Sequence, residues 1–284
     1  MAIQNLFYEG ERALYASKNL FIENIKFYPG ESPIKESENI KVVACEFMAK
    51  YPLWHCQHVN IDRSYFSVYS RAGIWYTQNV EMKNSVIDAP KMFRSVSHLQ
   101  LEDTKLNNAA ECLWNCDHIT LKNVQMSGAD YVFMNCHSVR ADNYNLQGNY
   151  SFQDARDVDV YDSHLDSKDA FWNTKNVSVY NSVLDGEYLG WYSENLKLVN
   201  CIISGSQPLC YAKNLVLENC TMINTNLAFE YSTVKADING HIESIKNPMA
   251  GYIRADSIGE VIFDENVRNR GGCEIIIAGK NRND

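Results

Sequence analysis

Apolar and polar residues alternate in short segments that recur about every 19 to 20 residues along most of the chain. If the first residue of each segment is position zero, the segments start at residues 19, 39, 58, 79, 98, 118, 138, 157, 176, 195, 214 and 233. Positions +1 and +3 are apolar in all twelve segments, and positions +2 and +4 are mostly polar. Such alternation predicts a half-buried β-strand. A repeat of this length predicts a solenoid, because each unit can bury its apolar face only against its neighbours.

Position +5 predicts a bend at the end of each strand. Asparagine and aspartate adopt the left-handed backbone conformation more readily than other residues that carry a side chain. Stacked from coil to coil, their side chains can also form an asparagine ladder. Apolar residues return at +8, so a second strand is expected after the bend. The +5 column contains Asn24, Asn84, Asp103, Asn123, Asn143, Asp162, Asn181, Asn200 and Asn219.

A variable turn rich in Gly, Asp and Asn follows the second strand. We expect a third strand before the next position zero, as in residues 112–116, 170–174 and 189–193. Large aromatic residues recur at position −4, and we interpret them as an internal stack; the alternative is a surface stripe that stacks on sugars. That column contains Trp54, Trp75, Trp114, Trp172, Trp191 and Phe229. In the coils that contain Phe93, Phe133 and Phe152, the pattern allows two strand registers that differ by one residue.

Three unequal strands, one asparagine bend and one variable turn describe a right-handed parallel β-helix. A left-handed hexapeptide helix would instead show a period near 18 and three equal sides. We therefore predict an all-β, right-handed parallel β-helix of about 12 coils over residues 1–242, in which residues 1–12 cap the N-terminal end. Residues 243–284 leave the repeat, and we predict a C-terminal capping or oligomerisation segment there, because an open stack exposes strand edges.

The charge and composition of the chain argue against several classes of function. The net charge of −9 argues against nucleic-acid binding, which needs a basic surface. The N-terminus lacks the pattern of a signal peptide and no apolar stretch is long enough to span a membrane, so a cytoplasmic protein without membrane contact is expected. Most of the nine cysteines fall in repeat columns that elsewhere hold Ser or Thr, which predicts packed free thiols. The spacing of Cys112, Cys116 and His118 allows zinc, but the columns already explain Cys116 and His118, and we expect no metal or cofactor.

The asparagine bends and the three-strand coils over residues 13–242 resemble the pectin-lyase-like right-handed β-helix superfamily. Residues 247–261 resemble the same segment of an uncharacterised bacterial group with short coils. Members of the superfamily cleave acidic polysaccharides, and their sites lie on the outer face of the strand before position zero. The resemblance therefore implies a site in columns −3 and −1. From these columns we predict a substrate-binding set of His55, Tyr76, Asn115, Asn135, Asn173, Tyr192 and Tyr211.

Candidate catalytic groups lie near the centre of the same face. They are Asp154, Arg156 and His137, together with Asp130 from a turn. A glycoside hydrolase needs two carboxyl groups about 5–5.5 Å or 6.5–9.5 Å apart, but the column neighbours of Asp154 are asparagines. A second carboxylate would have to come from a turn, from Glu111, Asp130, Asp166 or Asp169. A lyase would need a base and a group that neutralises charge, for which Arg156 or His137 could serve.

Two functions remain open after this reasoning. One is binding or cleavage of an oligosaccharide or polysaccharide on the outer strand face. The other is a non-catalytic scaffold that forms a homo-oligomer through residues 243–284, in which the charged residues of the outer face simply compensate one another. Missing paired carboxylates favour the scaffold, whereas the amide- and aromatic-rich face favours a carbohydrate partner.

Overall fold

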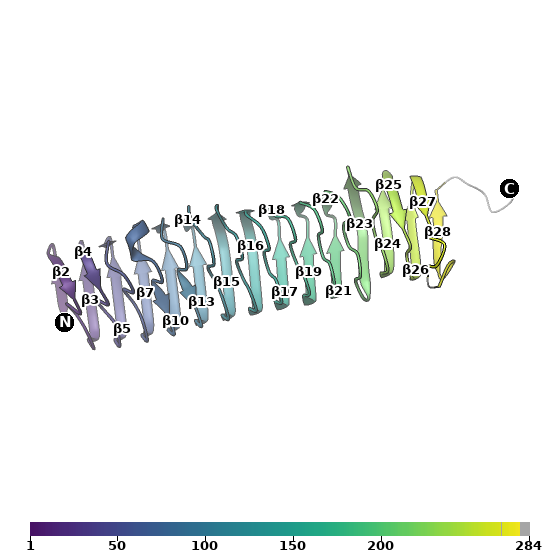
Figure 1. Cartoon of the computed structure of the whole chain (residues 1–284). Helices are drawn as coiled ribbons and strands as arrows, with labels where there is room; N and C mark the ends of the chain where they lie inside the picture. The colour runs from purple at the N-terminus through teal and green to yellow at the C-terminus, as the bar shows by residue number, and fades with distance from the viewer. Residues whose placement is uncertain (268, 279–284) are drawn as a thin grey trace. The chain divides into compact units, whose positions relative to one another are not determined.

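The computed structural model describes residues 1–267 and 269–278. The chain divides into two compact units, Met1–Gly148 (unit 1) and Asn149–Asp284 (unit 2). Each unit is a parallel β-solenoid in which successive coils pair strand to strand (Figure 1). Together the units contain about 14 turns, against the 12 predicted. Within the described residues, the one helical segment is a short 3₁₀ turn, η1 (Val68–Ser70), and no helix is long and apolar enough to cross a membrane.

Two sides of each coil in unit 1 are strands. The long side covers positions −1 to +4, and Val59 there pairs in register with Ile40 and Val80. The short side follows the +5 bend. The long-side strands are β1 (Ala2–Gln4), β3 (Lys18–Glu23), β5 (Glu38–Val43), β7 (Gln57–Asp62), β10 (Gln78–Lys83) and β13 (Ser97–Glu102). The short-side strands are β2 (Phe7–Glu11), β4 (Lys26–Glu31), β6 (Glu46–Phe47), β8 (Tyr65–Phe66), β11 (Val86–Ile87) and β14 (Lys105–Leu106). Strands β15 (Asp117–Met126) and β16 (His137–Gln147) run through both sides.

Unit 2 repeats this arrangement. Its long-side strands are β17 (Arg156–Tyr161), β19 (Lys175–Tyr180), β21 (Glu194–Val199), β23 (Leu215–Ile223), β24 (Thr233–Asn239), β26 (Ala250–Ala255) and β28 (Cys273–Ile277). Its short-side strands are β18 (His164–Asp166), β20 (Val183–Asp185), β22 (Ile202–Ser204), β25 (His241–Lys246) and β27 (Ser257–Ile262). The coil count exceeds the prediction because chain outside the repeat also pairs: β1 pairs with β3, and β26 pairs with both β24 and β28.

Left-handed residues form the corners between the sides. Every Asn and Asp of the +5 column has a φ between 48° and 54°. Side-chain hydrogen bonds link several of them, as where Asn200 Nδ2 donates to Asn181 Oδ1 (3.0 Å) and Asn219 Nδ2 donates to Asn200 Oδ1 (2.7 Å). Position zero forms a second corner, with Asn195 as an example at φ 59°. Both corners let the strands turn without a long loop.

The third side is not a strand in most coils, so this prediction was wrong. The residue at −3 is left-handed in most coils, as is Asn173 (φ 53°), and in most coils from Leu113 onward the residue at −5 is left-handed too, as is Phe171 (φ 59°). The backbone there forms successive tight turns. We call this the turn side. Only β9 (Ile74–Trp75) and β12 (Phe93–Arg94) are assigned as strands there within the described residues. Backbone hydrogen bonds still join neighbouring coils, for example from Phe171 N to Ser151 O (2.9 Å).

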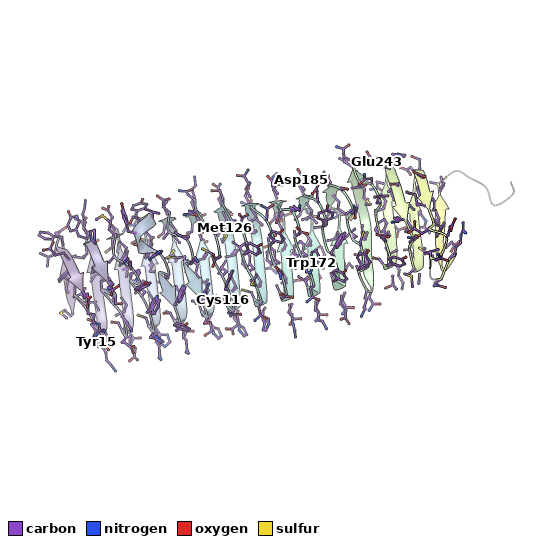
Figure 2. The ribbon with its side chains drawn as sticks, viewed as in Figure 1. Tyr15, Cys116, Met126, Trp172, Asp185 and Glu243 are labelled. Carbon is purple, nitrogen blue, oxygen red and sulfur yellow. The ribbon has the colours of Figure 1, made fainter. Side chains whose placement is uncertain are left out.

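The interior is continuous and apolar within each unit. All 24 residues predicted to point inward at +1 and +3 are buried. In unit 1, Phe47 stacks between Phe27 (ring centroids 4.8 Å apart) and Phe66 (4.6 Å). All nine cysteines are buried free thiols, and Cys116 lies inside unit 1 (Figure 2). The serines that share a column with Cys45 show why small polar groups suit it: Ser64 Oγ donates to Asp62 O (2.9 Å), back toward the corner.

The prediction of an internal aromatic stack at −4 was wrong for the tryptophans, although Phe229 of the same column is completely buried. All five tryptophans are only half-buried, and the inward residue is the one before them, at −5. The left-handed residue at −3 interrupts the two-residue alternation in each coil that contains a tryptophan, and −5 lies inside while −4 and −3 lie at the surface. Phe93, Phe133 and Phe152 are completely buried at −5, so their coils keep the common register.

Candidate functional site

The turn side of unit 2 carries a row of surface aromatic rings that we call the aromatic strip. Its central contacts are between Trp172 and Tyr192 (5.4 Å between centroids) and between Tyr192 and Tyr211 (5.0 Å, 15° between planes). Trp172 and Trp191 lie one coil apart at 5.5 Å, and Tyr231 extends the row at 5.9 Å from Tyr211. Tyr192 is 47% exposed. Because Tyr192 and Tyr211 stack face to face, the strip presents mainly the edges of its rings to solvent across several successive coils.

A polar group adjoins the strip in its −3 column. Asn173 Nδ2 donates to Asp154 Oδ1 (2.6 Å), and Gln153 Nε2 donates to Asp154 Oδ2 (3.3 Å). Both carboxylate oxygens of Asp154 are therefore held by neighbouring amides. Arg156 lies two residues further along the chain and is exposed. Unit 2 thus combines a polar end at Asp154 and Asn173 with an aromatic end at Tyr192 and Tyr211.

The tryptophans differ in what their indole N–H groups contact. The N–H of Trp191 donates to Gln207 O (2.7 Å), and those of Trp54, Trp75 and Trp114 also donate to backbone carbonyls. Trp172 Nε1 has no hydrogen-bond partner among the described residues. It is half-buried on the aromatic strip (Figure 2), so a hydrogen-bond donor is available beside the exposed ring of Tyr192.

Charged side chains around the strip are largely paired. Lys175 Nζ lies 3.2 Å from Glu194 Oε2, and Lys168 Nζ lies 3.5 Å from Glu187 Oε2. Burial and the nearby Glu230 carboxylate raise the pKa of Tyr211, which keeps its hydroxyl protonated. Burial likewise raises the pKa of Asp169, another carboxylate of this side. The strip itself is consequently close to neutral.

Unit 1 carries its own aromatic surface on the turn side. His55 stacks on Tyr76 (4.9 Å), and Trp54 stacks on Trp75 (5.1 Å). Arg94 takes the place of a tryptophan in this row, with its guanidinium carbon 4.4 Å from the Trp75 ring centroid and 4.5 Å from that of Trp114. Its Nη2 also lies 3.7 Å from Glu111 Oε2.

The predicted site residues are distributed between the two units. In unit 1, Asn135 Nδ2 donates to Asn115 Oδ1 (2.8 Å), which joins two members of the substrate-binding set. His137 and Asp130 are exposed in unit 1, whereas Asp154 and Arg156 belong to unit 2. The catalytic role of these four residues stays a prediction. Within the described residues, no group of three or more His, Cys, Asp or Glu side chains is placed to hold a metal ion.

Sequence reasoning placed Trp172 and Trp191 at the surface only as the alternative to an internal stack. The available signal was the bulky residue directly before most tryptophans, such as Leu53, Ile74 and Phe171, which competes for the interior. The histidines of position zero lie at the second corner. His98 and His118 stack at 4.6 Å, and His118 Nδ1 lies 2.7 Å from Asp117 Oδ2.

Residues 1–276 match the family described as "Protein of unknown function (DUF3737)", and the chain belongs to that family. A search of curated proteins finds no match. Similar solved structures include the HK620 bacteriophage tailspike double mutant (TM-score 0.43, 10% identity, covering 96% of this chain and 68% of that one). Another is the A-module of the Azotobacter vinelandii mannuronan C-5 epimerase AlgE6 (TM-score 0.37, 10% identity, 99% and 91%).

A third similar structure is the catalytic domain of a GH87 α-1,3-glucanase in complex with nigerose (TM-score 0.34, 9% identity, covering 99% of this chain). This chain spans 64% of the length of that domain. Similarities at these TM-scores and identities carry no argument about function, which has to come from the residues of the chain itself.

Proposed function

We propose that this member of the DUF3737 family is a carbohydrate-binding protein, with the aromatic strip of unit 2 as its binding surface. The observation that carries the proposal is the exposed ring of Tyr192, which lies within 5.4 Å of Trp172 and 5.0 Å of Tyr211. Large aromatic surface of this kind is unusual on a monomeric protein unless it binds something.

The chemistry of the strip suits a sugar. A pyranose ring has an apolar C–H face that packs on an aromatic ring, and hydroxyls at its edge that need hydrogen-bonding partners. The strip supplies rings, and its polar end supplies the Asn173 amide and the Asp154 carboxylate. The free N–H of Trp172 adds a donor. Aromatic surface with a few directed polar groups is the common composition of a ligand site.

The spacing of the strip supports a chain of sugars over a single one. Coils repeat at about 4.8 Å, and the ring centroids of Tyr192 and Tyr211 are 5.0 Å apart. One pyranose unit is about as long as this repeat. A linear oligosaccharide that runs across successive coils would therefore pass one aromatic residue with each sugar unit, along the exposed edges of the rings.

Binding without cleavage fits unit 2 better than hydrolysis. Both oxygens of Asp154 accept hydrogen bonds from Asn173 and Gln153, which fix the position of the carboxylate. The neighbour of Asp154 in its column is an amide, so a carboxylate pair does not arise there.

We also propose that the family belongs to the pectin-lyase-like superfamily, supported by its parallel coils and left-handed asparagine corners.

Isothermal titration with neutral and uronic oligosaccharides tests the proposal. We expect binding to one class, lost in Trp172→Ala and in Tyr192→Ala. Tyr69→Ala is the matched control, because Tyr69 is 65% exposed in η1 of unit 1 and lies outside the strip. A reducing-end assay on the bound sugar should detect no cleavage. Equal affinity of all three variants for the sugar would refute the site. Release of new reducing ends would show that the protein cleaves the sugar.

One observation favours the scaffold as a second candidate. Strands β1 and β2 pair with β3 and β4. Leu6, between β1 and β2, is 52% exposed, and Phe7, the first residue of β2, is 65% exposed. An unpaired strand edge with apolar residues is a template for association. Self-association detected by light scattering, reversed by Phe7→Glu but not by Tyr69→Glu, would support this candidate. A monomer at all concentrations would exclude it.

A further inference from the structure

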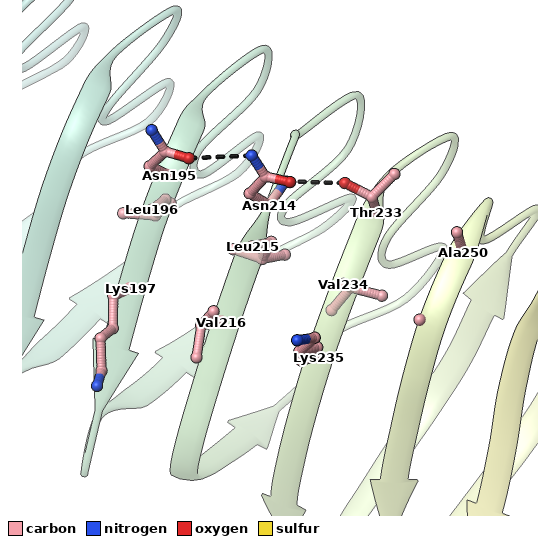
Figure 3. Close-up of a pocket in the computed structure, with 11 residues that line it drawn as sticks. Asn195, Leu196, Lys197, Asn214, Leu215, Val216, Thr233, Val234, Lys235 and Ala250 are labelled. Atoms are coloured by element: carbon pink, nitrogen blue, oxygen red, sulfur yellow. Dashed lines mark hydrogen bonds between the residues drawn. The ribbon is translucent and has the colours of Figure 1, made fainter.

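A shallow groove crosses four successive strands on the long side of unit 2, β21, β23, β24 and β26 (Figure 3). Its volume is about 530 Å³, which falls within the range of small-molecule sites. The lining is mostly apolar. It lies on a different side of the coil from the aromatic strip, so it does not depend on the function proposed above.

Small residues create the groove. Val216 lies between Lys197 and Lys235 in the +2 column, in register with both, and is much shorter than either. On the next strand, Gly251 has φ +100°, and a Cβ built there would lie 1.8 Å from Val234 O. No side chain can therefore occupy this part of the floor, which stays bare backbone beside Ala250.

The groove contains one ammonium group without a counter-ion. Lys197 Nζ is paired with Glu218 Oε1 (2.9 Å). Lys235 is exposed and has no ion pair within the described part of the chain. Thr233 lies two residues before Lys235 on β24, so both side chains are on the same face. The Thr233 hydroxyl accepts a hydrogen bond from Asn214 N (2.8 Å), which fixes it at the rim (Figure 3).

We propose that this groove binds an aliphatic carboxylate. The carboxylate would contact the Lys235 ammonium and the Thr233 hydroxyl, and the alkyl chain would pack on Val216 and on the carbon stem of Lys197. An anion complements the single uncompensated positive charge, and an alkyl chain complements the apolar floor. Four strands span about 14 Å at their usual spacing, which exceeds the extended length of hexanoate.

Methyl NMR of the full-length protein, labelled at valine, tests this assignment with hexanoate, hexan-1-ol and hexylammonium as probes. Hexanoate should shift the Val216 methyl signals and bind at least about tenfold more tightly than hexan-1-ol, the factor expected for a charge-assisted contact. Hexylammonium should bind most weakly. Equal affinity for the acid and the alcohol, or shifts that leave Val216 unaffected, would overturn the proposal.

Substitutions of Lys235 test whether its ammonium group binds the carboxylate. Lys235→Met keeps the carbon stem and should weaken hexanoate binding about tenfold, whereas Lys235→Arg keeps the cation and should retain it. Lys41→Met is the matched control, since Lys41 occupies the same column in unit 1 and its ammonium lies over the Phe21 ring. Hexanoate binding that survives Lys235→Met, or that Lys41→Met weakens equally, would show that Lys235 does not recognise the carboxylate.

Discussion

Tyr192 is placed where an asparagine would suit the backbone better. Its φ is +58°, a left-handed conformation that costs residues with ordinary side chains about 1–2 kcal/mol and costs asparagine less. Asn173 occupies the same column one coil away at φ 53°. Strain of this kind at a surface position is a reason to suspect function. We therefore expect Tyr192→Asn to remove the exposed ring without a large loss of stability.

The magnitude follows from the contacts. Removal of the ring forfeits its packing on Trp172 and Tyr211, about 0.5–1.5 kcal/mol for each aromatic pair when well formed, and less here because the ring is 47% exposed. Asparagine recovers about 1 kcal/mol of backbone strain and can donate to the oxygen of Asn173, for about 0.5–1 kcal/mol more. Tyr192→Asn should thus be within about 1 kcal/mol of the wild type. Tyr192→Ala recovers neither term and should be about 1.5 kcal/mol less stable than the asparagine variant.

Urea unfolding followed by both circular dichroism and tryptophan fluorescence measures these differences, provided that the two signals coincide. Both variants should lose oligosaccharide binding. Tyr28 on β4 is the control, because it is partly exposed and packs on Phe7 at 5.7 Å but has no left-handed backbone. At position 28, the asparagine variant should be no more stable than the alanine variant. Equal stability of the two Tyr192 variants would refute the strain argument, and retained binding in Tyr192→Asn would refute the role of the ring.

Four further expectations concern the fold. Asn200→Ala should lower the free energy of unfolding by about 2–3 kcal/mol, because it loses the side-chain hydrogen bonds and leaves alanine in a left-handed backbone conformation. Asn200→Gly should lower it by less, because glycine adopts that conformation without strain. Equal urea midpoints for the two variants would contradict this. Phe47→Ala should cost about 3–5 kcal/mol in urea unfolding, since Phe47 is completely buried. Ellman's reagent should find no reactive thiol in the native protein and nine after denaturation, because all nine are buried. The hydrogen bond from Tyr65 to Asp88 raises the pKa of the Tyr65 phenol to about 12. Because the folded state holds this proton more tightly, the stability of the wild type relative to Tyr65→Phe should be constant below about pH 10 and should fall as the pH rises toward about 12.

The strand pattern could be predicted because burial alone dictates it. Inward positions such as Val59 and Ile61 are apolar in every coil, and a shift of one residue would reverse the faces of the strand. The +5 corner was also predictable, since asparagine and aspartate are the residues that tolerate its backbone. Both signals are local and repeat many times, so they outweigh single exceptions such as Ala44 and Arg63, which adopt the same left-handed conformation.

The turn side could not be predicted by the same reasoning. Leu113, Phe133 and Phe171 are left-handed there, although bulky residues rarely adopt this conformation on their own. Pairing with the coils on either side imposes the left-handed conformation. Its cause is therefore tertiary structure, and the conformational propensities of the residues do not indicate it. The consequence was large for the candidate site, because it moved the tryptophans from the interior to the surface.

The solenoid separates the residues that fold the chain from those that can bind. Inward columns are fixed by packing, and corners are fixed by backbone conformation, so a substitution there acts first on stability. The −3 column of the turn side shares one left-handed backbone but no packing constraint, and its residues differ from coil to coil: Asp154 and Asn173 give way to Tyr192 and Tyr211. A change of residue type along a structurally uniform column has no cause in the fold. It points instead to a ligand whose own polar and apolar parts follow the same order.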